Sequence, residues 1–123
     1  MSEAGRRALR VAGLVRARFV EATRRELADP KLSGLVVSDV RITDDLSLVH
    51  VSVRFLGVES VDERRLLLRK LIRVLPRLRR SMLDKLELRR VPELRLHLDE
   101  GGDAAQRVEE LLKEIEEERK NKE

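Results

Sequence analysis

Residues 64–85, RRLLLRKLIRVLPRLRRSMLDK, decide how this chain folds, because their charged and apolar side chains separate at a helical spacing. The stretch holds nine Lys or Arg residues and one acid, Asp84, so it carries a formal charge of +8 in 22 residues. At about 100° per residue, the two sets fall on opposite faces of a helix. The pattern predicts a helix that packs its apolar face on a core and turns its cations outward. That apolar face comprises Leu67, Leu71, Val74, Leu75, Leu78 and Met82.

The cationic face points to a polyanionic partner. Charged rows on helices are usually solvated and of mixed sign, whereas this stretch has one acid among nine bases. Arginine is planar, always charged and suited to bidentate contact with phosphate. A nucleic-acid backbone, with RNA as the first candidate, is therefore the expected partner. The candidate RNA-binding residues are Arg65, Arg69, Lys70, Arg73, Arg77, Arg79, Arg80, Lys85, Arg89 and Arg90.

Pro76 interrupts this stretch, because proline lacks a backbone donor and its ring clashes with the preceding turn. We expect one helix over residues 62–75 and a second over residues 76–86, with Pro76 in the first turn of the second. Ser60 or Asp62 is the expected N-terminal cap of the first. The predicted interhelical kink comprises Val74, Leu75 and Pro76.

Further elements are predicted on both sides of this stretch. Residues 49–55 alternate apolar and polar side chains, which indicates a strand with one buried face. Asp29-Pro30 ends a first amphipathic helix, because proline disfavours helix at the preceding residue. The predicted elements, in chain order, are a helix over residues 6–28, strands over 35–43 and 48–55, the two helices above, a strand over 93–98 and a helix over 103–118.

This order predicts an α+β fold in which helices cover one face of a three-stranded sheet. It is the arrangement of a KH-like type II domain (α-β-β-α-kink-α-β), here with an added C-terminal helix. We expect the KH-like RNA-binding domain at residues 1–102, and an acidic C-terminal helix with a frayed tail at residues 103–123. A KH domain normally clamps RNA with a GxxG loop between two helices. No glycine lies between Gly57 and Gly101, so that loop is absent and Pro76 stands in its place.

Composition narrows the function classes. Charged residues make up 41% of the 123 residues and the net charge is +4, with residues 103–123 at −3 and the rest at +7. The chain has no Cys, which excludes disulfides and Cys-ligated zinc, and its only aromatics are Phe19 and Phe55. A base-stacking sheet of the RNA-recognition-motif type is therefore excluded. No segment approaches the roughly 20 apolar residues that span a bilayer, so we expect a cytoplasmic, monomeric protein without membrane contact.

Catalysis is the less favoured interpretation. His50 and His97 are the only histidines, and their positions between apolar residues place them on one sheet face as structural groups. The carboxylate pairs Asp44-Asp45 and Asp99-Glu100 could bind Mg²⁺ or exchange protons, but each follows a strand, where turn chemistry alone favours Asp. We expect no enzyme, no metal site and no cofactor. A nuclease on these carboxylates remains an alternative, as does a generic DNA- or RNA-binding module in which the helix-Pro-helix unit is a helix-turn-helix.

Four segments resemble the bacterial ribosome-binding factor A family. They are ELADPKL at residues 26–32, VRITDDL at 40–46 leading into VHVSV at 49–53, LELRRVPELRL at 86–96, and RVEELL at 107–112. The third segment is the most specific, since the family typically shows a basic, Leu-rich run followed by Pro-Glu-Leu. Four such pieces in the right order make the resemblance strong.

The resemblance implies a type II KH fold and binding to the free small (30S) ribosomal subunit through 16S rRNA. It further implies a role in late subunit maturation, including processing of the 16S rRNA 5′ end, without catalysis by the protein itself. Family members usually carry an Ala-x-Gly kink between the two helices, where this chain has Val74-Leu75-Pro76. We expect Pro76 to maintain the bend between the two helices, with less backbone flexibility than a glycine would give.

Overall fold

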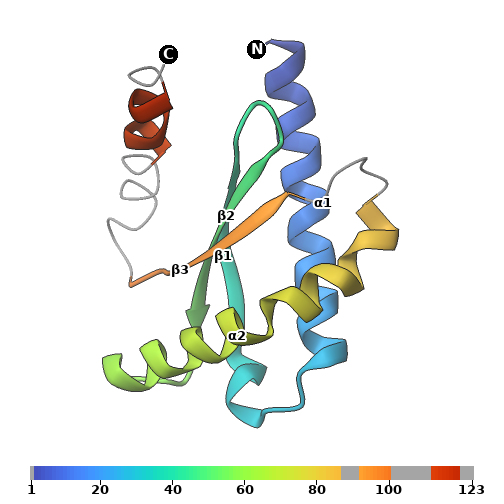
Figure 1. Ribbon diagram of the computed structural model, residues 1–123. Coiled ribbons are helices and arrows are strands. Elements are labelled where there is room, and N and C mark those ends of the chain that lie inside the picture. The colour runs from blue at the N-terminus through green and yellow to red at the C-terminus, as the bar shows by residue number, and fades with distance from the viewer. Residues whose placement is uncertain (1, 87–91, 101–111, 120–123) are drawn as a thin grey trace.

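The computed structural model describes residues 2–86, 92–100 and 112–119, and the side chains of these residues except at 83–86. Residues 112–119 are helical. Figure 1 shows the arrangement of the elements. In chain order they are α1 (Glu3–Glu26), a short 3₁₀ helix (Pro30–Gly34), β1 (Leu35–Ile42), β2 (Leu48–Phe55), α2 (Val61–Leu86) and β3 (Glu93–Leu98).

The three strands form one mixed sheet in the order β1-β2-β3. β1 pairs antiparallel with β2, and β2 pairs in parallel with β3, so that Val51 lies opposite both Val40 and Leu96. The register of β1 shifts between Val37 and Asp39, which makes Ser38 a bulge. The predicted α+β class, the hairpin and the third strand are confirmed; the relation to KH domains stays a prediction.

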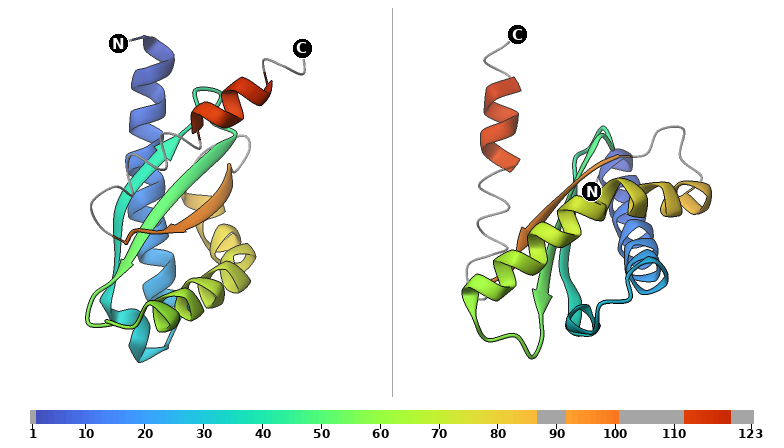
Figure 2. Two further views of the ribbon diagram at one scale, coloured as in Figure 1. Left: turned by 90° about the vertical axis from the view of Figure 1, so that its left-hand side faces the viewer. Right: turned by 60° about the horizontal axis from the view of Figure 1, so that its bottom comes forward.

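α1 and α2 cover one face of the sheet, and the helix at residues 112–119 lies on the other side (Figure 2). Alternate residues of β2 point toward α1 and α2, as the period of a strand requires. The core between these layers is apolar throughout. It contains Val11, Val15, Phe19 and Ala22 of α1, Val37 of β1, Val49, Val51, Val53 and Phe55 of β2, Leu67, Leu71, Leu78 and Met82 of α2, and Leu94 and Leu96 of β3, together with Val58 of the loop before α2.

The prediction of two helices around Pro76 is wrong: α2 runs from Val61 to Leu86 with Pro76 inside it. Leu71 and Leu78, on either side of the proline, are both fully buried in the same core, and this shared packing keeps the helix continuous. The proline leaves the Ile72 carbonyl without its usual helical donor, and both residues are exposed. The right view of Figure 2 shows that the axis changes direction in the yellow part of α2.

The ends of the helices also differ from the predictions. α1 begins at Glu3, where the Ser2 side chain accepts a hydrogen bond from the Gly5 amide, and it ends two residues before the predicted position. Ser60 caps α2, because its hydroxyl accepts a hydrogen bond from the Glu63 amide at 3.3 Å. The predicted helix over 103–118 is described only at residues 112–119, and the rest of it lies outside the described residues. No described helix combines the length and apolarity of a bilayer span.

Gly34 closes the sheet against the loop after β2. Its carbonyl accepts a hydrogen bond from the Leu56 amide at 2.8 Å, and a Cβ at this position would lie 2.2 Å from the Leu56 carbonyl oxygen. Both contacts are between backbones, so no side chain can move aside to admit a methyl group. The position therefore requires glycine for close approach.

We expect Gly34→Ala to lower the free energy of unfolding by about 1–3 kcal/mol, since the two backbone segments must separate. Urea denaturation measures this change. Gly13→Ala is the matched control, because a Cβ on Gly13, inside α1, meets nothing within 4 Å. That control should be neutral or stabilising, by up to about 1 kcal/mol. A Gly34→Ala variant as stable as the wild type would refute the close approach.

Candidate nucleic-acid interface

The outward face of α2 carries four arginines that have no partner within the described part of the chain. All four side chains are exposed, and none forms a hydrogen bond or ion pair with another described residue. Unpaired guanidinium groups keep their full set of donors for a partner. We call this set the α2 row; it comprises Arg65, Arg69, Arg73 and Arg80.

Three other predicted site residues of α2 contact the protein itself. Lys70 forms an ion pair with Asp29 at 3.4 Å. Arg77 donates to the Glu26 carbonyl at 2.7 Å and lies 3.5 Å from its carboxylate, so it joins α2 to the end of α1. Arg79 is partly buried. These cations border the α2 row, but their first role is to hold α2 in place.

The acids that accept these contacts are the last residue of α1, Glu26, and Asp29 in the segment that follows it. The pKa of the Asp29 carboxyl lies below its usual value because it accepts the Lys31 backbone amide and faces Lys70. Lys31 in turn forms an ion pair with Glu63 at 2.8 Å, which raises the pKa of Lys31. The 3₁₀ segment is thereby tied to the first turns of α2. Sequence analysis missed these partners, because their pairing depends on how the helices cross.

The kink residues lie at the middle of the α2 row. Val74 and Leu75 are partly buried against the core, whereas Pro76 is exposed. Pro76 lies between Arg73 and Arg80 along the helix, so any change of direction there re-aims the cations on either side. That Pro76 shapes the α2 row stays a prediction, consistent with its position in the helix.

Not every predicted residue can be placed. The side chain of Lys85, and all of Arg89 and Arg90, lie outside the described residues.

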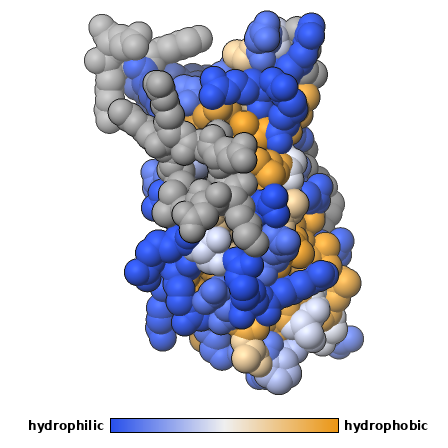
Figure 3. Space-filling view, turned by 90° about the vertical axis from the view of Figure 1, so that its right-hand side faces the viewer, coloured by the Kyte–Doolittle hydropathy of each residue, from blue (hydrophilic) through white to orange (hydrophobic). Residues whose placement is uncertain are grey.

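Figure 3 shows the side of the molecule toward which the end of α2 points. Hydrophilic side chains cover much of its lower part, and apolar patches lie between them. Exposed Leu66 and Ile72 border the α2 row, so the surface around it is not purely ionic.

His50 and His97 meet on the sheet face that points away from α1 and α2. Nδ1 of His50 lies 2.6 Å from Nε2 of His97, and the rings stack with centroids 4.9 Å apart. One nitrogen carries the shared hydrogen and the other accepts it. His50 is only 2% exposed, and its Nε2 has no hydrogen-bond partner among the described residues. The predicted position of the two histidines on one sheet face is confirmed, and their direct contact is a finding of the structure.

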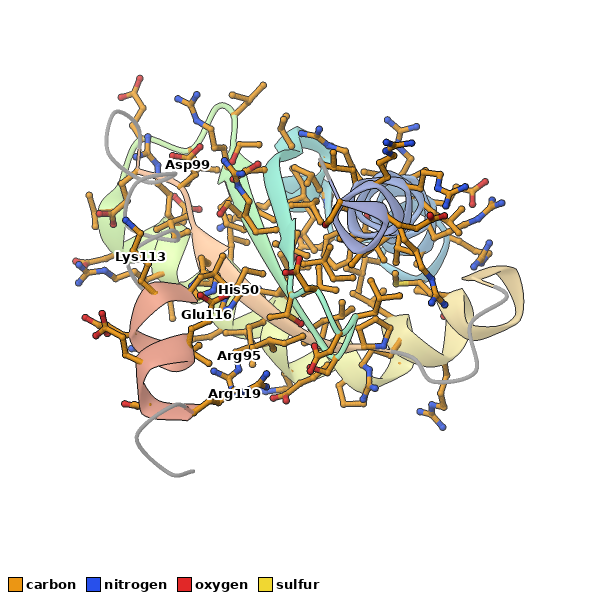
Figure 4. All side chains as sticks on the ribbon, turned by 90° about the horizontal axis from the view of Figure 1, so that it is seen from above. His50, Arg95, Asp99, Lys113, Glu116 and Arg119 are labelled. Atoms are coloured by element: carbon orange, nitrogen blue, oxygen red, sulfur yellow. The ribbon has the colours of Figure 1, made fainter. Side chains whose placement is uncertain are left out.

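The surroundings of the pair disfavour protonation. Burial lowers the pKa of His50 to about 4, and His97 and Arg95 act in the same direction, opposed by Glu93. Burial and Arg95 also lower the pKa of His97. Figure 4 shows the helix at residues 112–119, with Lys113, Glu116 and Arg119, beside the strand face that bears His50 and Arg95.

We expect the protein to lose stability as the pH falls from about 6.5 towards 4. In this window the unfolded chain takes up protons on both histidines while the folded state resists them, so acid favours unfolding. Urea denaturation at pH 7.5 and pH 4.5 measures the effect. The double variant His50→Gln/His97→Gln should show a smaller drop between these pH values. An equal drop in both proteins would assign the acid sensitivity to other groups.

In the first carboxylate pair, Asp44-Asp45, the Asp45 side chain stabilises the turn between β1 and β2. The Asp45 carboxylate accepts hydrogen bonds from Ser47 and Thr43, each at 2.7 Å, which lower the pKa of Asp45 to about 2. Arg119 lies 3.4 Å from the same carboxylate. A carboxylate fixed in this way supports the hairpin between β1 and β2 and is poorly suited to proton transfer near neutral pH.

Comparisons with known proteins agree on one family. The protein-family model described as ribosome-binding factor A matches residues 7–112. A ribosome-binding factor A from Sorangium cellulosum is 46% identical over 116 residues, which cover 94% of this chain and 93% of that protein. The crystal structure of ribosome-binding factor A from Thermus thermophilus has a TM-score of 0.62 at 25% identity, and covers 74% of this chain and 94% of that one.

A third comparison concerns a complex. A homology model of Thermus thermophilus ribosome binding factor A, fitted into the cryo-electron microscopy map of a 30S complex, has a TM-score of 0.58 at 27% identity. The match covers 72% of this chain and 90% of that one.

Proposed function

Since the chain belongs to the ribosome-binding factor A family, we propose that it binds the free small ribosomal subunit and assists late maturation of that subunit. The 30S complex of the Thermus thermophilus relative supports this partner. The α2 row is the proposed contact, and 16S rRNA is its proposed ligand. The protein would act by binding energy alone, and maturation would include processing of the 16S rRNA 5′ end by other enzymes.

This proposal rests on one observation: some cations of α2 are paired with acids of the protein and others are not. Lys70 and Arg77 satisfy acids of the protein, whereas the α2 row has no internal partner within the described residues. Desolvating charges is unfavourable unless they are paired. A row of unpaired guanidinium groups on a helix fixed by its buried face is therefore suited to phosphates, whose positions it can match with little loss of side-chain freedom.

Binding at this row would hold a segment of rRNA in one conformation, or deny that conformation to later factors, until the protein leaves. Only contacts stronger in one rRNA conformation than in another can shift such an equilibrium. The helix-turn-helix alternative lacks the turn that it needs, because α2 continues through Pro76. The geometry thus favours a single helix lying along RNA.

Co-sedimentation tests the proposed partner. The protein is mixed with purified small subunits, large subunits and whole ribosomes at about 50 and 200 mM salt, a range over which phosphate contacts weaken strongly. We expect selective retention on free small subunits. Equal retention on all three particles, lost together as the salt rises, would instead identify a generic polyanion binder.

A further inference from the structure

α1 carries its own set of unpaired arginines. Three of its seven arginines contact the protein: Arg16 donates to the Val37 carbonyl at 2.6 Å, Arg18 pairs with Glu21 at 3.0 Å, and Arg25 hydrogen-bonds to Ser81. The other four are exposed and form no hydrogen bond or ion pair with any residue that the structure describes. They are Arg6, Arg7, Arg10 and Arg24.

Three of these four side chains follow one side of the helix. At about 100° per residue, Arg6, Arg10 and Arg24 fall within about 40° of one another. Gly13 and Ala17 lie on the same side, and a Cβ on Gly13 would meet nothing within 4 Å. The strip between the arginines is therefore open to a chain that passes along it. At about 1.5 Å per residue, it is roughly 27 Å long.

The N-terminal end of this strip is far from α2. The two helices meet near the end of α1, where Arg77 binds Glu26 and Arg25 binds Ser81. Arg10 precedes that crossing by about 15 residues, or roughly 23 Å of helix. Figure 1 shows the first half of α1 extending beyond the crossing. A phosphate at Arg6, Arg7 or Arg10 cannot also contact the α2 row.

We infer that the N-terminal half of α1 is a second RNA contact, which binds the phosphate backbone of an rRNA segment other than the one on the α2 row. The inference rests on the proposed function, because both contacts belong to one docked protein. Two contacts on one fold make the second binding event intramolecular, which raises the overall affinity and fixes the orientation of the protein. Neutralisation of phosphates is the chemistry of both.

The test is the affinity for free small subunits between about 50 and 200 mM salt. The variant Arg6→Gln/Arg7→Gln/Arg10→Gln should bind about tenfold more weakly at 100 mM salt. The slope of log affinity against log salt should become shallower by about 0.7 for each phosphate that the variant no longer neutralises. Arg18→Gln is the matched control, because that arginine is paired with Glu21, and it should leave both quantities unchanged. Circular dichroism confirms that α1 stays helical.

Unchanged affinity and slope in the folded triple variant would overturn the second contact. A combined variant that also replaces Arg65, Arg69 and Arg73 separates this inference from the proposed function. If both surfaces bind, the two fold-losses multiply, since the sites are well over 10 Å apart. If only the α2 substitutions weaken binding, the second contact is wrong and the proposed site stands. If only the α1 substitutions do, the site on α2 is wrong and the contact on α1 stands.

Discussion

Reversing Arg65, Arg69 and Arg73 to Glu should reduce the affinity for free small subunits by roughly 1000-fold. Each charge-assisted hydrogen bond to phosphate contributes about 1.5 kcal/mol, and a loss of about 1.4 kcal/mol is tenfold in affinity. The three residues are exposed and have no partner in the described residues, so the fold should persist. A binding titration measures the loss, and circular dichroism checks the fold.

Two control variants show whether the loss of affinity depends on where the arginines lie or only on the charge of the protein. Replacing the same three arginines by Lys keeps the charge and should retain most of the binding, with a penalty wherever bidentate contacts exist. Arg54→Glu changes an exposed arginine on the sheet face away from α2, so it should leave the affinity nearly unchanged when compared with Arg69→Glu. If Arg54→Glu and Arg69→Glu weaken binding equally, the effect is one of net charge and the α2 row is not the site.

Phe19→Ala should lower the free energy of unfolding by about 3–5 kcal/mol, the usual loss for truncating a buried aromatic side chain. Phe19 is fully buried between α1 and the sheet, in contact with the core that both helices share. Native proteins are stable by only about 5–15 kcal/mol. The variant should therefore be close to unfolding at 37 °C, which a urea titration at lower temperature would quantify.

The matched control for this prediction is Leu9→Ala on the same helix. Leu9 is 60% exposed, so its truncation should change the free energy of unfolding by no more than about 0.5 kcal/mol. Phe19→Leu should fall between the two, since it keeps part of the buried surface. A loss below about 1 kcal/mol in Phe19→Ala would contradict the central place of α1 in the core.

The elements in which apolar residues recur at a regular spacing over many residues could be predicted from sequence. The side chains of Leu67, Leu71, Leu78 and Met82 repeat at helical spacing, and all four are buried as predicted. The expectation that β2 buries a single face is wrong, because His50 and Ser52 on the other face are each only 2% exposed. The alternation over residues 49–55 did predict the strand and the face that packs on the helices. In both cases the local pattern and the tertiary packing agree, so the pattern alone was sufficient.

The predictions that failed concern residues whose conformation or partners are determined by tertiary contacts. Pro76 carries a strong local signal for a break, but packing on both sides of it keeps α2 continuous. Arg77 has the helical phase of an outward residue, yet the crossing of α1 brings it to Glu26. His50 and His97 are in contact although they are 47 residues apart in the sequence, which no local spacing reveals. These positions depend on the arrangement of whole elements and not on propensity.

Site-directed photo-cross-linking tests the central claim most directly. A photoreactive side chain is placed at Arg69 in one protein and at Arg54 in another, each is bound to free small subunits and irradiated, and the attached species are identified. We predict that position 69 cross-links to 16S rRNA while position 54, on the opposite side of the sheet, gives little or none. Cross-links to rRNA from position 54 and none from position 69 would show that the protein docks by another face.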